Sequence, residues 1–167
     1  MRLGLMTSCI ALALLVGFAA GITSRSAIAD PMKSAMTTAT DGWTIHADAT
    51  MHFANHPNEV IHHFCKPFAN GFIECQLYDG HGPQAQLVGV ETVVSPAVYA
   101  TFSASEKRLW HWHRTEIPKI HLVFPGLSKE EAAKMTAGFL PTYGKAYILW
   151  DPMDTKNPIG QPTVRVY

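Results

Sequence analysis

The chain has 167 residues, and its 13 lysines and arginines balance its 13 aspartates and glutamates, so the formal net charge at pH 7 is zero. No basic block is present, and the composition therefore gives no support to nucleic-acid binding, which depends on positive charge against phosphate. The length suits one domain with a hydrophobic core, and the sequence contains neither an internal repeat nor a second domain boundary.

The first 29 residues have the pattern of a signal peptide. Arg2 supplies a positive start, residues 3–20 are almost wholly apolar, and Ala27-Ile28-Ala29 matches the small-x-small pattern that signal peptidase cleaves. Cleavage after Ala29 would place the mature protein in the periplasm or outside the cell. An uncleaved membrane anchor is the alternative, because the apolar run is nearly long enough to span a bilayer.

The mature chain is predicted to be a short leader followed by one domain. Removal of residues 1–29, which include Arg2 and Arg25, leaves 11 basic against 13 acidic residues. No second long apolar stretch follows, so we expect no transmembrane segment in the mature chain. Residues 30–41 are small, polar and rich in threonine, which predicts a flexible leader. The domain is then expected to cover residues 42–167.

The strongest local signal is a β-hairpin. Residues 60–68 and 72–78 flank Asn70-Gly71, a dipeptide typical of tight hairpin turns. Within the second of these segments the side chains alternate with the period of a strand. After a turn, residues 87–94 (LVGVETVV) indicate a further, buried strand.

Two capping boxes predict helices in the second half of the chain. Ser103-Ala-Ser-Glu106 predicts a helix that begins there and ends near His113, because a proline follows at position 118. Ser128 with Glu131 predicts a second helix, which continues to about Leu140.

Two more strands complete the predicted elements, one over residues 120–124 and one over residues 145–150. Strands in succession, joined by a hairpin and followed by few and late helices, are typical of an α+β domain. We therefore expect a single α+β domain with a mainly antiparallel sheet and two or three helices.

Five separate motifs resemble the oil body-associated protein family, a domain of unknown function found in plants, fungi and bacteria. The match keeps its order and spacing over about residues 50–162. One segment, Leu109-Trp110-His111-Trp112-His113 with Glu116, matches the family's Trp-His-Ser-His segment. The other four are His62-His63-Phe64-Cys65, Glu74-Cys75-Gln76-Leu77-Tyr78-Asp79, Leu87-Val88-Gly89-Val90-Glu91, and Tyr143-Gly144-Lys145 with Trp150.

The resemblance implies a member of this family without an established activity, and the signal-peptide pattern predicts that this member is an exported, bacterial-type one. Plant members sit on seed oil bodies in the cytoplasm, so a lipid surface enters as a partner by this resemblance only. The chain departs from the family at Trp112, where a small polar residue is usual, and at Ile148, where histidine is frequent. The resemblance therefore implies the family's fold and motifs for this chain.

Histidines within these motifs give the candidate functional site. Neutral imidazole binds zinc or copper, and two or three such ligands suffice together with a carboxylate. On the first hairpin strand His63 shares a face with Ile61 and Cys65, and it is therefore expected to point inward. The predicted ligands of a zinc or copper ion are His63, His111, His113 and Glu116.

Convergence of these four side chains requires a bend in the backbone. In an extended segment His111 and His113 share a face, and Glu116 lies on the opposite one. In a continuous helix His113 and Glu116 are one turn apart, and His111 turns away. All three converge if a helix ends near His113 and the chain bends there.

A metal-free interpretation of the same residues stays open. Buried imidazoles beside tryptophans would form a polar network, hydrogen-bonded to Glu91 or Glu116. His46, His56 and His81 are expected at the surface or in turns. The same expectation covers His52, which is the first candidate for an exception because the family often has histidine at its position.

Three functions follow from these alternatives. The first is an uncharacterised protein whose histidine-rich pocket binds a divalent metal, and the second is a metal-dependent enzyme that uses that pocket. The third is a non-enzymatic structural or lipid-interface protein. No catalytic residue is assigned, because the sequence contains neither a nucleophile-elbow serine nor a glycine-rich phosphate loop.

Pairing of Cys65 with Cys75 depends on the hairpin loop. A two-residue loop, Asn70-Gly71, would turn the two cysteines to opposite faces, whereas a three-residue loop with Gly71 left-handed would place them opposite each other. Plant relatives carry both cysteines in a reducing cytoplasm, so their presence does not require a bond. We expect two free, buried thiols.

Overall fold

The computed structural model describes residue 39 and residues 41–165, which belong to one compact unit of the chain. The predicted signal peptide, residues 1–29, and nearly all of the predicted leader, residues 30–41, lie outside the described residues. The expected domain, residues 42–167, is described up to residue 165.

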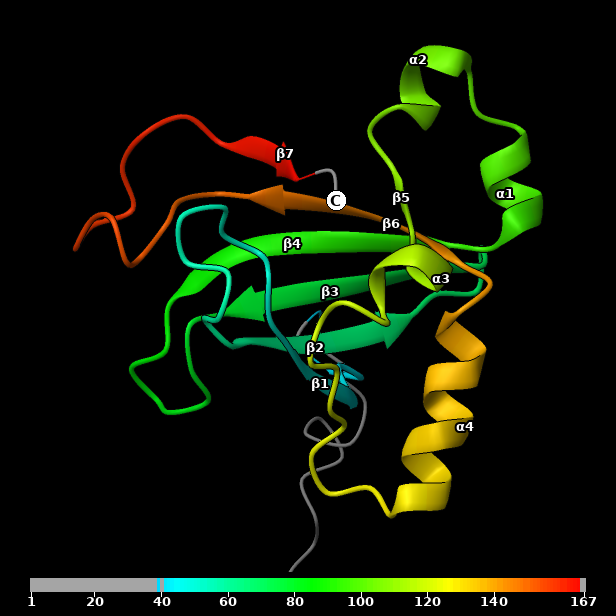
Figure 1. Cartoon of the computed structure of the whole chain (residues 1–167), viewed down its shortest axis with the longest axis horizontal. Coiled ribbons are helices and arrows are strands. Elements are labelled where there is room, and N and C mark those ends of the chain that lie inside the picture. The colour runs from blue at the N-terminus through cyan, green and yellow to red at the C-terminus, as the bar shows by residue number, and fades with distance from the viewer. Residues whose placement is uncertain (1–38, 40, 166–167) are drawn as a thin grey trace, which may run out of the picture. The chain divides into compact units, whose positions relative to one another are not determined.

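An antiparallel sheet of seven strands is the main element of the fold. Six strands lie in the order β1-β2-β3-β4-β6-β5, and β7 pairs with β6 (Figure 1). The strands are β1 (Ile45–Ala49), β2 (Ile61–Pro67), β3 (Phe72–Tyr78), β4 (Leu87–Val94), β5 (His111–Trp112), β6 (Tyr143–Ile148) and β7 (Thr163–Arg165). The expectation of an α+β domain on a mainly antiparallel sheet is thus confirmed for the described residues.

Four short helices accompany the sheet in the described part of the chain, where the sequence predicts two or three. They are α1 (Pro96–Ala100), α2 (Ala104–Lys107), α3 (His113–Glu116) and α4 (Lys129–Phe139). The capping box that starts α4 is complete: the side chain of Ser128 accepts from the Glu131 amide, and the side chain of Glu131 accepts from the Ser128 amide. None of the helices in the described part of the chain could cross a membrane, because none combines sufficient length with sufficient hydrophobicity.

The predicted helix from Ser103 to His113 is wrong beyond its first turn. α2 ends at Lys107, and the chain then extends as β5 along the edge of β6. The capping box remains half formed, because Oε1 of Glu106 accepts from the indole N–H of Trp110 and from the Lys145 ammonium group instead of the Ser103 amide. Edge pairing with β6 therefore replaces the expected helical turns.

The predicted strand over residues 120–124 is also wrong. Only one pair of backbone hydrogen bonds, between Asp48 and Val123, joins this segment to β1. The Leu122 amide donates to the Ile120 carbonyl at 3.0 Å, so the backbone turns inside the segment instead of extending.

The hairpin between β2 and β3 has the three-residue loop, Ala69 to Gly71. The Phe68 amide donates to the Phe72 carbonyl at 2.8 Å, and Gly71 takes the left-handed conformation with φ of 83°. Cys65 consequently lies directly opposite Cys75, and the two form a disulfide. Our expectation of two free thiols is therefore wrong, because the loop parity aligns the two side chains on one face.

Pairing across the strands defines two faces of the sheet. The row Ala47, His63, Leu77, Gly89 and Ile148 and the row Ile45, Cys65, Cys75, Glu91 and Ala146 lie on what we call the inner face. Neighbouring residues such as His62 and Phe64 project from the outer face, because side chains alternate along a strand. The inner face carries most of the buried core, including Ile61 and Leu77, which have no exposed surface.

Reduction of the disulfide should destabilise the domain. The bond closes a loop between positions ten residues apart, for which the chain-entropy model gives about 2–3 kcal/mol of stabilisation. A Cys9→Ser variant produced in an oxidising compartment and denatured without reductant should titrate no thiols, and two after reduction. Two thiols before reduction would contradict the pairing. In a Cys65→Ser/Cys75→Ser control, reductant should leave the unfolding midpoint unchanged.

Candidate metal centre

A glycine on β6 makes room for a cluster of charged and polar side chains on the inner face. Gly144 pairs with His111 on β5 and with Val93 on β4, so it lies between the two strands that carry the cluster. A side chain at this position would collide with Glu91, His111 and His113. The absence of a Cβ atom at Gly144 thus allows these three residues to meet.

Four side chains meet in this space. Nε2 of His111 lies 3.2 Å from Oε1 of Glu91 and 3.0 Å from Oε2 of Glu116. Nε2 of His113 lies 3.4 Å from Oε1 of Glu91 and 3.8 Å from Oε2 of Glu116. All four residues are buried. Two imidazole nitrogens and two carboxylates therefore face one another away from water.

A bend in the chain between β5 and α3 produces this convergence. His111 projects from the extended strand β5, and Trp112 is the extended cap residue that precedes α3. His113 and Glu116 are then the first and last residues of α3 and lie one turn apart. The expected bend thus occurs, but by a strand that runs into a helix and not by a helix that ends at His113.

His63 approaches the same cluster from β2. Its Nε2 is 3.9 Å from Oε2 of Glu91 and 2.9 Å from Nε2 of His52. The prediction from strand parity that His63 points inward is confirmed, since it lines the pocket beside Glu91. Both His63 and His52 are buried, so a fifth and a sixth side chain extend the cluster.

Hydrogen bonds fix the ring tautomers of His113 and His63. The Thr142 hydroxyl donates its only proton to the Phe139 carbonyl at 2.7 Å, so it accepts from Nδ1–H of His113. The Ile61 carbonyl accepts from Nδ1–H of His63 at 3.0 Å. When these rings are neutral, Nε2 of each carries its lone pair toward the cluster, which is the form that binds a metal.

Protonation within the cluster follows from burial and opposite charge. Burial alone would lower the pKa of His111, but hydrogen bonds and charges from Glu116 and Glu91 outweigh burial and raise it to about 9. Burial would raise the pKa of Glu91, but the hydrogen bond from His111 and the charge of that ring hold it well below its usual range. Without a metal, His111 is therefore the cation that offsets these carboxylates at pH 7.

The two outlying histidines are neutral for a different reason. Burial, reinforced by the neighbouring His63, lowers the pKa of His52 to about 3. Burial also lowers the pKa of His63, although the charge of Glu91 opposes this. Both rings are therefore uncharged at pH 7, and neutral imidazole is the form that ligates metals.

A small pocket of about 50 Å³ lies beside the cluster. Its polar walls include His52, His63, Glu91, His113 and Glu116. Its remaining walls are mostly apolar, among them the Cys65–Cys75 disulfide, Ile117 and Phe139. A space of this size accommodates an ion together with a few molecules as small as water.

Of the four residues predicted from the sequence, His111, His113 and Glu116 thus meet directly, and His63 reaches them through Glu91. Sequence reasoning treated Glu91 only as a hydrogen-bond partner, whereas the structure places it at the centre. A single acidic residue within LVGVETVV is the signal that identifies it, because a charge on a buried strand needs partners.

Comparison with known proteins identifies relatives over most of the described chain. The family model described as "Protein of unknown function (DUF1264)" matches residues 37–166. Oil body-associated protein 1B of Arabidopsis thaliana is 35% identical over 104 residues, which cover 62% of this chain and 43% of the relative. Oil body-associated protein 1A of Zea mays is 35% identical over 105 residues, which cover 62% of this chain and 44% of the relative. The chain thus spans less than half the length of these relatives, and no solved structure matches it significantly.

Replacement of Gly144 by alanine should disrupt the cluster. The added methyl group has no room between Glu91, His111 and His113, and overpacking of this kind costs about 1–3 kcal/mol of unfolding free energy. Gly138→Ala is the matched control, because Gly138 lies in α4 with nothing near its Cβ position and should be stabilised by up to about 1 kcal/mol. Chemical denaturation of both variants measures the difference, and equal stability of the two would contradict the crowding at Gly144.

Proposed function

We propose a function from the premise that this chain belongs to the DUF1264 family, a family of proteins of unknown function. The proposed function is the binding of one divalent transition-metal ion in the buried histidine–glutamate pocket. Glu91, His111 and His113 are the principal ligands, and Glu116 and His63 complete the set of donors around them.

One observation carries this proposal: ligand atoms of Glu91, His111 and His113 all lie within 4.8 Å of one another in a buried space. Imidazole nitrogens and a carboxylate oxygen form the donor set of many zinc sites. Thr142 orients His113 through Nδ1, as groups behind metal ligands commonly do. The arrangement therefore supplies both ligands and the support that aims them.

Charge favours a divalent ion in this pocket. Glu91 and Glu116 bring two carboxylates into a space that excludes water, and buried carboxylates need compensating charge. A divalent cation supplies that charge and takes the place of the proton on His111, so binding releases a proton. Zinc and copper suit a donor set of imidazole and carboxylate groups.

Addition of Zn²⁺ to the chelator-treated protein should load one equivalent into this pocket. His111→Ala and His113→Ala should each lose that equivalent, because loss of a direct ligand costs more than the roughly 10–100-fold that loss of a supporting group costs. Equilibrium dialysis with metal analysis measures the bound zinc.

His121→Ala serves as the control, since His121 is exposed and outside the cluster, and it should bind as much zinc as the unaltered chain. Equal zinc content in all three variants and the unaltered chain would mean that the cluster is only a structural polar network.

A metal-dependent enzyme is the second candidate, and the pocket beside the cluster favours it. Catalytic metal sites keep one position open for water or substrate, and a space of about 50 Å³ restricts that substrate to a very small molecule. Azide added to the Co²⁺-loaded protein should shift its visible absorption bands if such a position exists, and the part of the shift that comes from this pocket should be missing in His111→Ala. Unchanged bands would leave only the binding function.

Two further parts of the proposal concern location and lipid. Export is supported by the Cys65–Cys75 disulfide, because disulfides persist in oxidising compartments. The relatives' name, oil body-associated protein, supports contact with a lipid surface by family membership alone. The metal site rests on donors that are present among the described residues.

If the chain is exported as proposed, the protein recovered from the periplasm or the medium should begin at Asp30. The physical reason is the Ala27-Ile28-Ala29 pattern that follows the apolar run. Intact-mass spectrometry of the exported protein measures this directly. A mass that includes residues 1–29 would instead identify the segment as an anchor.

A further inference from the structure

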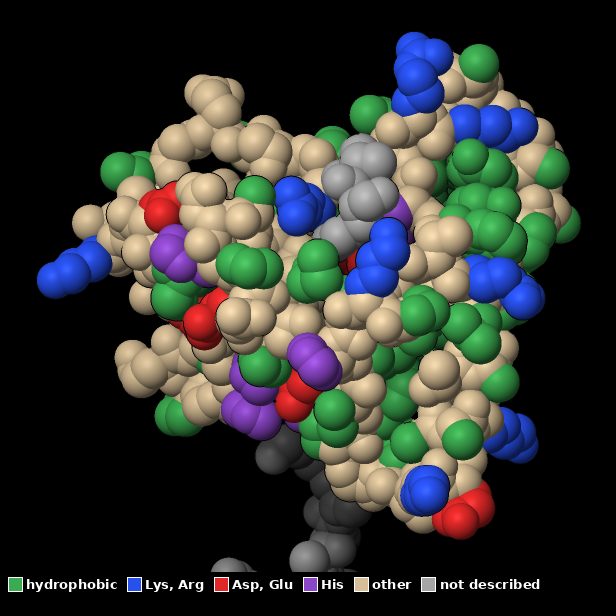
Figure 2. Space-filling view, viewed as in Figure 1, with side chains coloured by type: hydrophobic (Ala, Val, Ile, Leu, Met, Phe, Trp, Pro, Cys, Tyr) green, Lys and Arg blue, Asp and Glu red, His purple; other side chains and the backbone are tan. Residues whose placement is uncertain are grey.

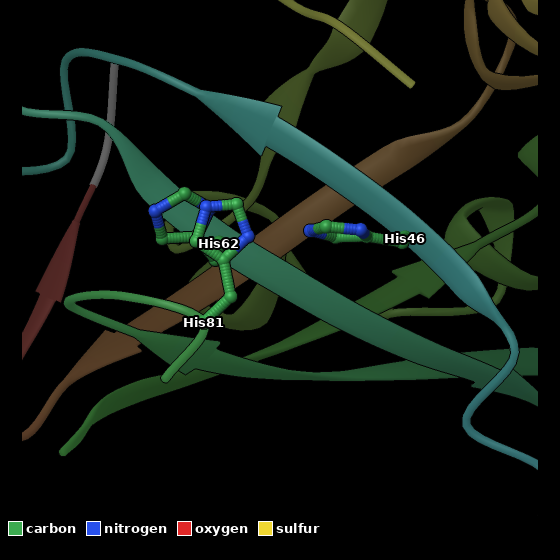
Figure 3. A group of neighbouring side chains, drawn as sticks. All are labelled: His46, His62 and His81. Atoms are coloured by element: carbon green, nitrogen blue, oxygen red, sulfur yellow. The ribbon is translucent and has the colours of Figure 1, made fainter. Parts of the chain in front are cut away.

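A second group of histidines lies on the outer face of the sheet, on the side opposite the buried pocket. It consists of His46 on β1, His62 on β2 and His81 in the loop after β3, and we call it the outer histidine cluster. Histidine and acidic side chains gather at the surface in the lower part of Figure 2. Figure 3 shows the three rings close together, with a nitrogen of His46 directed toward the rings of His62 and His81.

Strand alternation produces the cluster. Asp48 pairs with His62 across β1 and β2, and His46 pairs with Phe64 one step along. The side chains of His46 and Asp48 therefore share the outer face with that of His62. His63, the next residue on β2, points to the inner face, so the backbone of the sheet separates the two groups of histidines.

Distances within the cluster are short for residues from three separate segments. One ligand atom from each histidine lies within 4.8 Å of the others. The ring centroids of His62 and His81 are 3.8 Å apart, and those of His46 and His81 are 5.6 Å apart. His62 is buried, His46 is partly buried and His81 is exposed, so the cluster opens to solvent at His81.

Asp48 supports the cluster from β1. Its Oδ1 lies 2.6 Å from Nδ1 of His62 and 3.0 Å from Nε2 of His46. A carboxylate only accepts hydrogen bonds, so Nδ1–H of His62 donates and Nε2 of a neutral ring keeps its lone pair. Carboxylates behind metal-binding histidines act in this way.

We propose that the outer histidine cluster is a solvent-accessible site for a divalent transition-metal ion, with His46, His62 and His81 as ligands and Asp48 as the positioning residue. The site would bind Zn²⁺, Cu²⁺ or Ni²⁺, which favour imidazole. Water fills the fourth position, because His81 lies at the surface.

Only a small movement separates the present arrangement from coordination. Two nitrogens on a tetrahedral zinc ion, each at 2.0–2.1 Å, are about 3.4 Å apart, so gaps of up to 4.8 Å must close by on the order of 1 Å. His81 lies between Gly80 and Gly82 in an exposed loop, and it is the ligand best placed to move. His62 and His46 are held by strands and by Asp48.

The decisive experiment is a Zn²⁺ titration of the full chain, followed by equilibrium dialysis. His81→Ala should weaken binding of one equivalent at least tenfold while leaving the unfolding midpoint unchanged, because His81 is an exposed loop residue. His121→Ala, another exposed histidine, should match the unaltered chain. Zinc stoichiometry and affinity in His81→Ala equal to those of the unaltered chain would overturn the proposal.

Two comparisons separate this site from the buried one. His111→Ala should lose the zinc ion of the buried pocket, whereas His81→Ala should weaken binding of the zinc ion at the outer cluster. A His81→Ala/His111→Ala chain should show both effects. An error in one of the two proposed sites can therefore be told from an error in the other. Asp48→Asn should weaken binding at the outer cluster by about 10–100-fold without changing the number of ions bound. An affinity unchanged by Asp48→Asn would overturn the positioning role.

Discussion

Two buried carboxylates that share His111 as a partner are the constraint on which the inner face of this protein depends. Glu91 and Glu116 are withdrawn from water, and in such a place each negative charge needs a hydrogen-bond donor or a cation. The chain extends as β5 where a helix was expected, it then turns into α3, and Gly144 has no side chain. Together these three features bring His111 and His113 to the carboxylates. The local geometry is therefore explained by the need of the two buried carboxylates for hydrogen-bond donors or a cation.

The strands β2, β3, β4 and β6 could be predicted from the sequence, because they carry their own signals, whereas β1, β5 and β7 were not predicted. The hairpin, the strand over residues 87–94 and the capping box at Ser128 all reappear in the structure. The predictions failed where distant partners decide the outcome. Glu106 could complete a capping box, but it accepts from Trp110 and Lys145 instead, and Lys145 is far away in the sequence. The disulfide depended on one residue of loop length, which the sequence left open.

The candidate site could likewise be predicted from the sequence only in part. The parity of β2 suffices to turn His63 inward, and the motif around His111 marks the segment that carries most of the cluster. The single charge on a buried strand marks Glu91 in the sequence, but its place in the cluster follows from the pairing of β4 with β6, which brings that residue beside Gly144. The outer histidine cluster was missed for a related reason: His46, His62 and His81 lie on separate segments, and their proximity depends on strand register and on the path of a loop.

The consecutive residues His62 and His63 point to opposite sides of one strand, and this has a consequence for how the protein can change over evolutionary time. Deletion or insertion of a single residue ahead of this pair in β2 would shift the strand by one position and exchange the two faces. His63 would then lie at the surface, and His62 would point into the core. Loops that carry no cluster residue and do not set the strand register can lengthen or shorten with little effect on either cluster, whereas β2 can vary only by substitution.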